Sequence, residues 1–470
     1  MHRERNSIFC MRTLFSSGGW RPCIFPQTLF CGLLALLISL APLSLLNAPP
    51  TDFPKGAVIR DAEIEDALRA FIDPLLVQAG INPKKLKLFV INDSTINAFA
   101  TFGPMIVIHT GLLMRCRRVE ELLAVLAHEI GHIKGSHIAP RIDALNKAMT
   151  ESLIGMGLGA VLTVITGSTA PWLLGSSLGG QLGARKFLSF NRSQEMQADL
   201  ISVQLLKALN WPTDGAASLF QMFQEESTGL SSQQMVYMQT HPLPQERLDV
   251  ARQNAHSGGR LPPKFPAMFW AIQAKIAANT DRPDVPLRLS FYKTPEMLVY
   301  GQAIQAYRKG SLKQATKAFE KLVVKDSQNP YFQEQLAGLY LDQGKMNQAL
   351  TAINKAIGLS PKPHTLLRLT KAHILILQNK NLSQAEQLLK TIVLEEPWNG
   401  AAWYFLGTAA GRLGSIPESR LYLAEYQTVR GNMKEARQQL AVAKKGLPKN
   451  SALMLRAEDL EALLKQERGH

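Results

Sequence analysis

The sequence predicts a mainly α-helical protein of the α+β class, with a small sheet in its N-terminal half and an α-solenoid in its C-terminal half. Three observations predict this arrangement. Apolar residues recur at helical spacing ahead of His128, and short apolar runs near residues 86–92 and 105–110 are typical of strands. After residue 309, small residues recur about every 34 positions. At 470 residues the chain has room for two or three domains.

The N-terminus predicts export. Four arginines precede an apolar run from Thr28 to Leu46, which ends in Asn47-Ala48-Pro49-Pro50. This is the pattern of a signal peptide that is cleaved after Ala48. An uncleaved membrane anchor is the alternative, because the run approaches the length of a membrane span. We therefore expect residues 1–48 to be a signal peptide or N-terminal anchor, with Met1 or Met11 as the start.

The net charge indicates which partners the protein suits, and the cysteine content indicates whether it has an internal disulfide. The formal net charge is +15, and loss of the four arginines and one glutamate of residues 1–48 would leave about +12. A basic exported protein suits an anionic membrane surface or acidic clients. We expect no nucleic-acid partner, since no binding motif is present and the leader argues against one. Of the four cysteines only Cys116 lies beyond the leader, so no internal disulfide is expected.

The first elements after the leader are a helix and two strands. Residues 62–79 have the spacing of an amphipathic helix, and strands are expected near 86–92 and 105–110. We predict that Ile106, Val107 and Ile108 form an edge strand to which an extended substrate adds by backbone hydrogen bonds. A plain core strand remains the alternative.

The next element is a helix that carries His128-Glu129-Ile130-Gly131-His132. Positions i and i+4 share a helix face, so both imidazoles can bind one Zn²⁺. Glu129 then lies beside the metal and can take a proton from a bound water, whose pKa zinc lowers toward neutrality. The pattern predicts metal-assisted hydrolysis of a peptide bond.

A catalytic zinc needs a third protein ligand and an open position. In the HExxHxxGxxH pattern Gly135 is in register, but the third-ligand position is Ile138, and His137 falls one residue early. The remaining candidate is Glu195 on a later helix, with Asp199 one turn further on the same face. Asp199 can either orient a ligand histidine or donate a proton to the leaving group.

HExxH followed some sixty residues later by ExxAD resembles the gluzincin peptidases of the HtpX and CAAX-prenyl-protease type. The resemblance is closest to the periplasmic branch that carries a tetratricopeptide tail, and it spans about residues 55–465. Three further stretches carry it, namely 96–113, Asn191-Arg192-Ser193 and the loop 240–247. One departure is Gly103-Pro104, where the family usually has paired glycines.

The resemblance implies one zinc ion per chain, held by the two HExxH histidines and Glu195, and a periplasmic location. It also implies that His241 can approach the zinc as a regulatory fourth ligand and hold the enzyme latent until substrate displaces its loop. Arg247, in the same loop, is a candidate to contact a carboxylate or a substrate oxyanion near the site.

Residues 152–184 contain no charged residue and are rich in glycine. The segment 167–171 divides them into two apolar pieces that are short for membrane spans. We expect a helical pair packed on the catalytic domain, with possible contact to a membrane surface. A spanning hairpin, as in membrane-bound relatives, is the alternative.

The C-terminal part predicts tetratricopeptide repeats. Lys309-Gly310 with Ala315 recurs as Gln343-Gly344 with Ala349 after 34 residues, and further turns follow at similar spacing. Such repeats stack into a solenoid with a concave face for partners. An ordinary helical bundle is the alternative. The expected domains are a zinc metallopeptidase over 52–258, a proline-bearing connector over 259–295 and the repeats over 296–466.

The sequence therefore predicts an exported zinc endopeptidase whose repeats bind clients. By resemblance the clients are unfolded or stalled outer-membrane β-barrel proteins, and the repeats dock on the barrel-assembly machinery. The protein would degrade misfolded precursors and could also assist folding. Two alternatives remain, a chaperone or assembly scaffold with little proteolysis, and a membrane-embedded peptidase that requires residues 152–184 to span.

Overall fold

The computed structural model describes residues 56–101, 104–137, 192–226, 236–280, 294–362 and 364–466. All of them belong to one unit, Pro49–His470. The leader, Gly103, Asn191 and the apolar stretch 152–184 lie outside the described residues, so the expectations about them stay predictions. Within the described ranges no helix is both long and apolar enough to cross a membrane.

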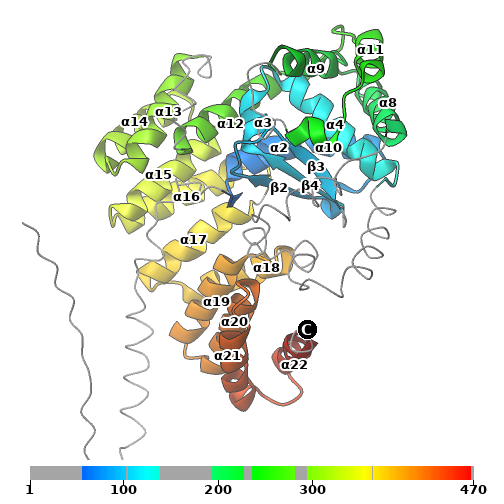
Figure 1. Ribbon diagram of the computed structural model, residues 1–470. Helices are drawn as coiled ribbons and strands as arrows, with labels where there is room; N and C mark the ends of the chain where they lie inside the picture. The colour runs from blue at the N-terminus through cyan, green and yellow to red at the C-terminus, as the bar shows by residue number, and fades with distance from the viewer. Residues whose placement is uncertain are drawn as a thin grey trace, which may run out of the picture. The chain divides into compact units, whose positions relative to one another are not determined.

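The predicted fold class is confirmed, because helices dominate and the strands form one small sheet (Figure 1). The sheet consists of β1 (Val58–Ile59), β2 (Lys87–Ile91), β3 (Ala98–Thr101) and β4 (Met105–His109). The helices that surround it are α2 (Ala62–Gln78), α3 (Thr110–Arg115), α4 (Val119–Lys134), α8 (Arg192–Ala208), α9 (Gly215–Glu226), α10 (Val236–Thr240), α11 (Gln245–Gln253) and α12 (Phe265–Asn279), and a short 3₁₀ turn spans Pro83–Lys85.

The order of the strands corrects one prediction. The sheet has the order β1-β2-β4-β3, with β2 and β4 parallel and β3 and β4 antiparallel. Ile106, Val107 and Ile108 therefore lie in an inner strand that is paired on both sides, and the prediction that they form the edge was wrong. The edge strands are β1 and β3, and β3 takes the edge next to β4 because residues 98–101 fold back on β4 as a hairpin in which Ala98 pairs with Ile108. Among the described strands, β3 has a neighbour on one side only.

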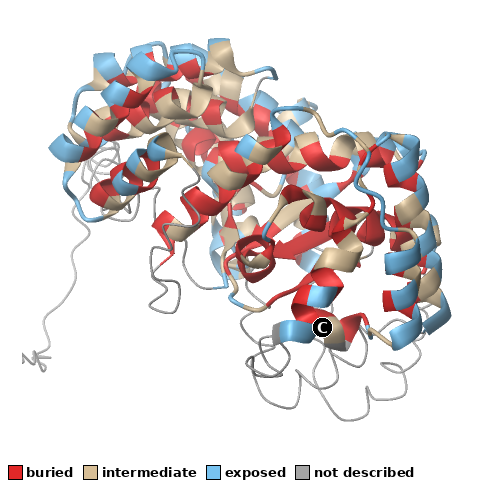
Figure 2. Cartoon of the chain, turned by 90° about the horizontal axis from the view of Figure 1, so that it is seen from above, coloured by how far each residue is buried: buried red, intermediate tan, exposed pale blue. Residues whose placement is uncertain are grey.

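Successive side chains along a strand point to opposite faces of the sheet, and the two faces meet different surroundings. Ile106 and Ile108 face the core that the sheet shares with α2, α4 and α12, whereas Val107 faces the other side with Phe89 and Phe99. Figure 2 shows buried residues concentrated in the sheet and in the helices packed on it, with exposed residues on the outer helix faces. Helix α4 is buried from Val119 to His132 except at Glu120, since it packs against α2, α8, α9 and β3.

The C-terminal helices form the predicted repeats. They are α13 (Pro295–Arg308), α14 (Leu312–Lys325), α15 (Pro330–Asp342), α16 (Met346–Leu359), α17 (Thr365–Gln378), α18 (Leu382–Glu395), α19 (Gly400–Arg412), α20 (Ile416–Val429), α21 (Met433–Gly446) and α22 (Ala452–Gln466). Gly310, Gly344 and Gly414 adopt left-handed φ values of 74°, 71° and 86°, which glycine takes at low cost. Ala315 and Ala349 are fully buried in the hydrophobic core of the first repeats.

Helix α12 connects the sheet-containing part to the repeats. It falls within the predicted connector, but Phe265, Phe269 and Ile272 belong to the same core as α2 and α4. Lys275 of the same helix is buried, with its Nζ 2.8 Å from Asp61 Oδ2 and 3.2 Å from Glu63 Oε2. The Tyr300 hydroxyl of the first repeat helix donates to Glu63 as well. The two parts are thus joined through buried charges.

Candidate metal centre

The crossing of α4 and α8 brings the candidate ligands together. A Cβ on Gly131 would lie 2.7 Å from the backbone oxygen of Ala198, so only glycine lets the two helices approach this closely. Glu195 lies one turn before Ala198 on α8 and faces His128 and His132 on α4. Within the HExxH motif, Gly131 thus allows the second helix to approach, and His132 next to it offers a metal ligand.

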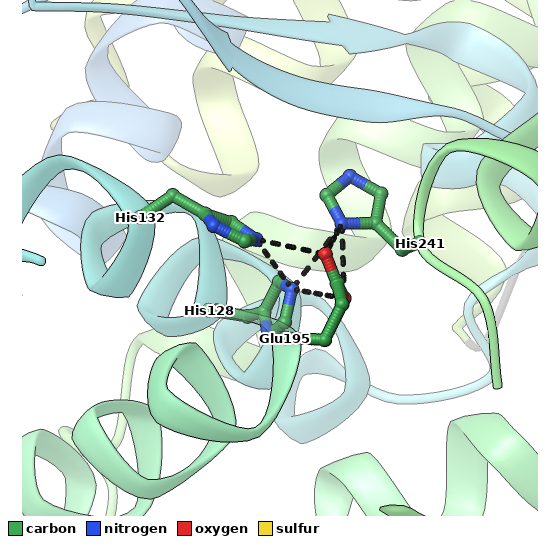
Figure 3. Close-up of side chains that lie close together, drawn as sticks. All are labelled: His128, His132, Glu195 and His241. Carbon is green, nitrogen blue, oxygen red and sulfur yellow. Dashed lines mark hydrogen bonds and ion pairs between the residues drawn. The ribbon is translucent and has the colours of Figure 1, made fainter. Parts of the chain in front are cut away.

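Four buried side chains converge on one point, as Figure 3 shows. His128, His132, Glu195 and His241 each offer one ligand atom, and these atoms lie within 4.8 Å of one another. The two Nε2 atoms of the α4 histidines are 3.0 Å apart, and each lies 3.4 Å from one oxygen of Glu195. His241 Nδ1 lies 3.1 Å from Glu195 Oε1 and 3.4 Å from His128 Nε2.

The donor set fits a metal ion. His128 donates from Nδ1 to Asp199 Oδ1 over 2.8 Å, so its Nε2 presents a lone pair to the cluster. Three imidazole nitrogens and a carboxylate that face each other at this distance are the donor types and number that a zinc site uses. The sequence had placed all four residues near one metal, and the geometry brings them together.

Charge within the cluster favours an ionised Glu195. Burial works against it, but the neighbouring imidazoles of His128, His132 and His241 hold the pKa of Glu195 below its usual range. Burial lowers the pKa of His132 well below its usual value. Burial also opposes protonation of His128, yet Asp199 and Glu195 outweigh it and raise the pKa to about 10. A metal therefore competes with a proton at His128.

Glu129 lies between the cluster and the edge strand. Its Oε2 accepts a hydrogen bond from the backbone N–H of Ala100 in β3 over 2.8 Å. Its Oε1 lies 3.6 Å from His241 Nε2 and accepts no hydrogen bond from any residue that the structure describes. Burial raises the pKa of Glu129, which suits a carboxylate that must take up a proton.

Asp199 and Arg247 form a buried pair behind the ligands. Arg247 donates from Nε and Nη2 to the two oxygens of Asp199 over 2.6 and 2.9 Å. Its Nη1 lies 2.7 Å from Glu195 Oε2 and donates to the carbonyl of Pro242 over 2.7 Å. Arg247 thus contacts carboxylates, the first of its two expected roles. The oxyanion role stays a prediction, and these four contacts give it no support.

The protonation state of Asp199 distinguishes between its two predicted roles, orienting a ligand histidine and donating a proton to the leaving group. Burial raises its pKa, but hydrogen bonds from His128 and Arg247 outweigh burial and lower the pKa below its usual range. An ionised Asp199 has no proton to give to a leaving amine, whereas it accepts from His128 Nδ1 as an orienting group must. The geometry therefore favours the orienting role.

His241 is held by the structure around its loop. It follows α10, and its ring stacks on Tyr237 with centroids 4.6 Å apart and planes 26° apart. The Tyr237 backbone N–H donates to the carbonyl of Ile96 over 2.9 Å, which ties α10 to the residues just before β3. Arg247 holds the carbonyl of Pro242 on the other side.

Sequence reasoning missed several residues near the site. Tyr237 carries no motif, and Ala100 lies in the stretch 96–113 that carries the resemblance but was given no role of its own. His137 was considered as a third metal ligand and rejected, but its Nδ1 lies 3.0 Å from Nδ1 of His132. Gln197, between the two acidic residues of α8, lies 2.9 Å from His137 Nε2. The signal for His137 was its position five residues after a ligand, just past the end of a helix.

Comparison with known proteins now gives the class. Residues 61–255 match peptidase family M48, and residues 300–362 match the tetratricopeptide repeat. The chain therefore carries a metallopeptidase domain of family M48 followed by tetratricopeptide repeats.

Two named relatives are similar to this chain over most of its length. The chain is 26% identical to the beta-barrel assembly-enhancing protease of Yersinia pestis over 359 residues, which cover 74% of this chain and 72% of the relative. It is 25% identical to the protein of the same name from Escherichia coli (strain K12), over 77% of this chain and 78% of that one. The mitochondrial metalloendopeptidase OMA1 of Schizosaccharomyces pombe is 28% identical over 37% of this chain and 48% of its own length.

Proposed function

We propose that this protein is an exported zinc endopeptidase that acts in the assembly and quality control of outer-membrane β-barrel proteins. One observation carries the catalytic part of the proposal. The ligand atoms of His128, His132 and Glu195 meet at one buried point, and Glu129 stands beside them with an oxygen that no described residue hydrogen-bonds. This is the donor set of a catalytic zinc with a general base next to it.

The zinc ion, when bound, polarises the scissile carbonyl and lowers the pKa of a water. The protein groups do the rest. Glu129 takes the proton of the attacking water on Oε1 and passes it to the departing amine, since its raised pKa lets it hold a proton briefly. Asp199 and Arg247 keep His128 and Glu195 oriented throughout.

The edge of β3 that no described strand pairs with is the proposed place for the substrate backbone. The Ala100 N–H, directed away from β4, reaches Glu129, so a peptide paired along β3 would pass the general base. Binding through backbone groups depends little on the substrate's side chains. This would suit an enzyme whose clients share an extended state and differ in sequence.

His241 supplies the proposed latency. Its Nδ1 is one of the four converging ligand atoms, so it can occupy the position that a water or substrate carbonyl needs. The stack on Tyr237 holds it there. Displacement of the loop after α10 would open the site.

The clients and location are proposed from the relatives and the leader. Two relatives are named for β-barrel assembly, and tetratricopeptide repeats are protein-binding modules. We therefore assign misfolded or stalled outer-membrane proteins as substrates and the barrel-assembly machinery as the partner of the repeats. The basic, apolar leader supports a periplasmic location.

The test compares wild type, Glu129→Gln and His241→Ala as purified residues 49–470. We expect one zinc per chain in all three, no casein cleavage by Glu129→Gln, and faster cleavage by His241→Ala. Chelation should stop cleavage by wild type, and added zinc should restore it. Glu120→Gln, in the first turn of the same helix, is the matched control and should behave as wild type.

Two results would reject parts of the proposal. Cleavage by Glu129→Gln at the wild-type rate would exclude Glu129 as the base. Zinc without proteolysis in wild type and in His241→Ala would favour a chaperone or scaffold over a protease.

A further inference from the structure

The end of helix α4 has a specific turn that brings His137 back over His132. Ser136 adopts a left-handed φ of 55°. The His137 N–H donates to the His132 carbonyl, and the Ser136 N–H donates to the Ile133 carbonyl, each over 3.1 Å. These two bonds and the left-handed residue define a Schellman motif. In that motif the residue after the left-handed position contacts the third residue from the helix end, usually through apolar side chains.

Here the contact is a chain of hydrogen bonds between polar groups. Gln197 Oε1 can only accept, so it receives the proton of His137 Nε2 over 2.9 Å. His137 Nδ1 is then an acceptor and takes the Nδ1 proton of His132 over 3.0 Å. His132 is left with a lone pair on Nε2, the atom that faces Glu195 and the other candidate ligands.

Gly135 provides the space for this chain. A Cβ at this position would lie 2.4 Å from Nε2 and 2.7 Å from Cε1 of His137. Any other residue would therefore push the His137 ring away from its present place. Gly135 also fits the HExxHxxG pattern. In this protein the packing of the His137 ring explains the glycine, without a third histidine ligand.

We propose that His137 and Gln197 are a positioning pair that sets the tautomer and ring orientation of His132 as a metal ligand. The pair is the counterpart of Asp199, which does the same for His128 over 2.8 Å. The proposal rests on the metal site of the proposed function. Removing such an outer partner of a zinc ligand costs about 10- to 100-fold in metal affinity.

The test is zinc affinity, measured by competition with a chromogenic chelator, together with the visible absorption of the Co²⁺ form. His137→Leu removes the acceptor, and we expect a 10- to 100-fold weaker zinc affinity and an altered Co²⁺ spectrum. His137→Asn places an amide oxygen near the former Nδ1 and should restore most of the affinity. His256→Leu, which removes an exposed imidazole, is the control.

Gln197 and Gly135 allow two independent tests. Gln197 is exposed, so Gln197→Leu leaves the core intact and should weaken zinc binding less than His137→Leu does. Gln221→Leu, at an exposed position of α9, is its control. Gly135→Ala should weaken binding in wild type but add nothing to His137→Leu. Gly358→Ala, where a Cβ meets open space, should have no effect.

The outcomes separate this proposal from the one on which it rests. Wild type that binds neither zinc nor Co²⁺ would reject the metal site and this assignment with it. A second result would reject the positioning pair alone. In it wild type binds zinc, His137→Leu and Gln197→Leu bind zinc with the same affinity as wild type, and the Co²⁺ spectrum is unchanged.

Discussion

At the scale of single residues, the candidate site is a set of buried charges that depend on one another. Glu195, Asp199 and Arg247 are all largely buried, and Arg247 touches both carboxylates. A buried charge is tolerated when it is paired and hydrogen-bonded, and losing one partner is costly because the other charge stays buried. The planar guanidinium can serve two carboxylates at once, which a lysine ammonium cannot do in the same geometry.

We therefore predict that Arg247→Lys weakens the site although the charge is kept. A lysine cannot make all the hydrogen bonds of the guanidinium, so zinc affinity should fall. The free energy of unfolding should fall by about 1–3 kcal/mol, the cost of a buried acceptor left without its donor. Arg247→Met should cost more, about 3–5 kcal/mol. Urea denaturation and chelator competition measure both effects. Arg252→Lys, exposed on the same helix, is the control, and equal results for the two lysine variants would contradict the prediction.

At the scale of elements, the junction between α2, α12 and the first repeats carries acidic groups in excess. Glu334 on α15 has a buried Oε2 that no described residue hydrogen-bonds. Burial raises its pKa to about 8, with Lys275 acting against the shift and Asp61, Glu63 and Asp66 adding to it. Burial raises the pKa of Glu63 in the same way. Helices that pack this tightly around carboxyl groups favour the protonated form.

This gives a prediction for pH. The pKa of Glu334 is higher in the folded chain than in the unfolded one, so its protonation stabilises the fold at low pH. That contribution is complete below the unfolded pKa of about 4.5 and is lost as the pH rises through about 8. Glu334→Gln should remove this part of the pH dependence and should stabilise the protein more at pH 9 than at pH 5. Melting temperatures across this range test it.

The control for that experiment is Glu435→Gln, at an exposed position of α21. It should leave the pH dependence of the melting temperature as in wild type. A Glu334→Gln variant that follows the wild-type curve at every pH would mean that Glu334 ionises normally in the folded protein.

At the scale of the whole chain, the peptidase and repeat parts share a buried ion cluster. Lys275 lies on α12, while Asp61 precedes α2 and Glu63 lies within it. Tyr300 of α13 reaches the same Glu63. Burial opposes a charge on Lys275, but Asp61, Tyr300 and Glu63 outweigh it and raise its pKa well above the usual value. The repeats and the peptidase domain are therefore expected to stabilise each other.

We predict that Lys275→Met destabilises the protein by about 3–5 kcal/mol, since it leaves Asp61 and Glu63 without their cation. Adding Glu63→Gln should recover part of the loss, because one uncompensated charge is removed. Urea denaturation of both variants measures this. Lys313→Met, at an exposed position of α14, serves as the control. A Lys275→Met variant as stable as this control would show that the cluster contributes nothing.

Much of the fold and site could be predicted because the signals are local. The i, i+4 spacing of His128 and His132, the acidic residue on α8 and the 34-residue period each follow from helix geometry over a few turns. The edge strand could not be predicted in this way. Its identity depends on which strands pair, and the hairpin of β3 onto β4 buries Ile106, Val107 and Ile108 between two neighbours.

The sequence by itself determined the chemistry of this protein, namely the residue types that can hold a metal and the repeats that can bind a partner. Tertiary structure alone decided which groups orient those ligands. His137 reaches His132 through a helix-end turn, Arg247 reaches Glu195 across 52 residues, and Lys275 meets Asp61 across the chain. Burial limits the access of water to these groups, so their polar atoms depend on protein partners, and the packing of distant segments supplies those partners.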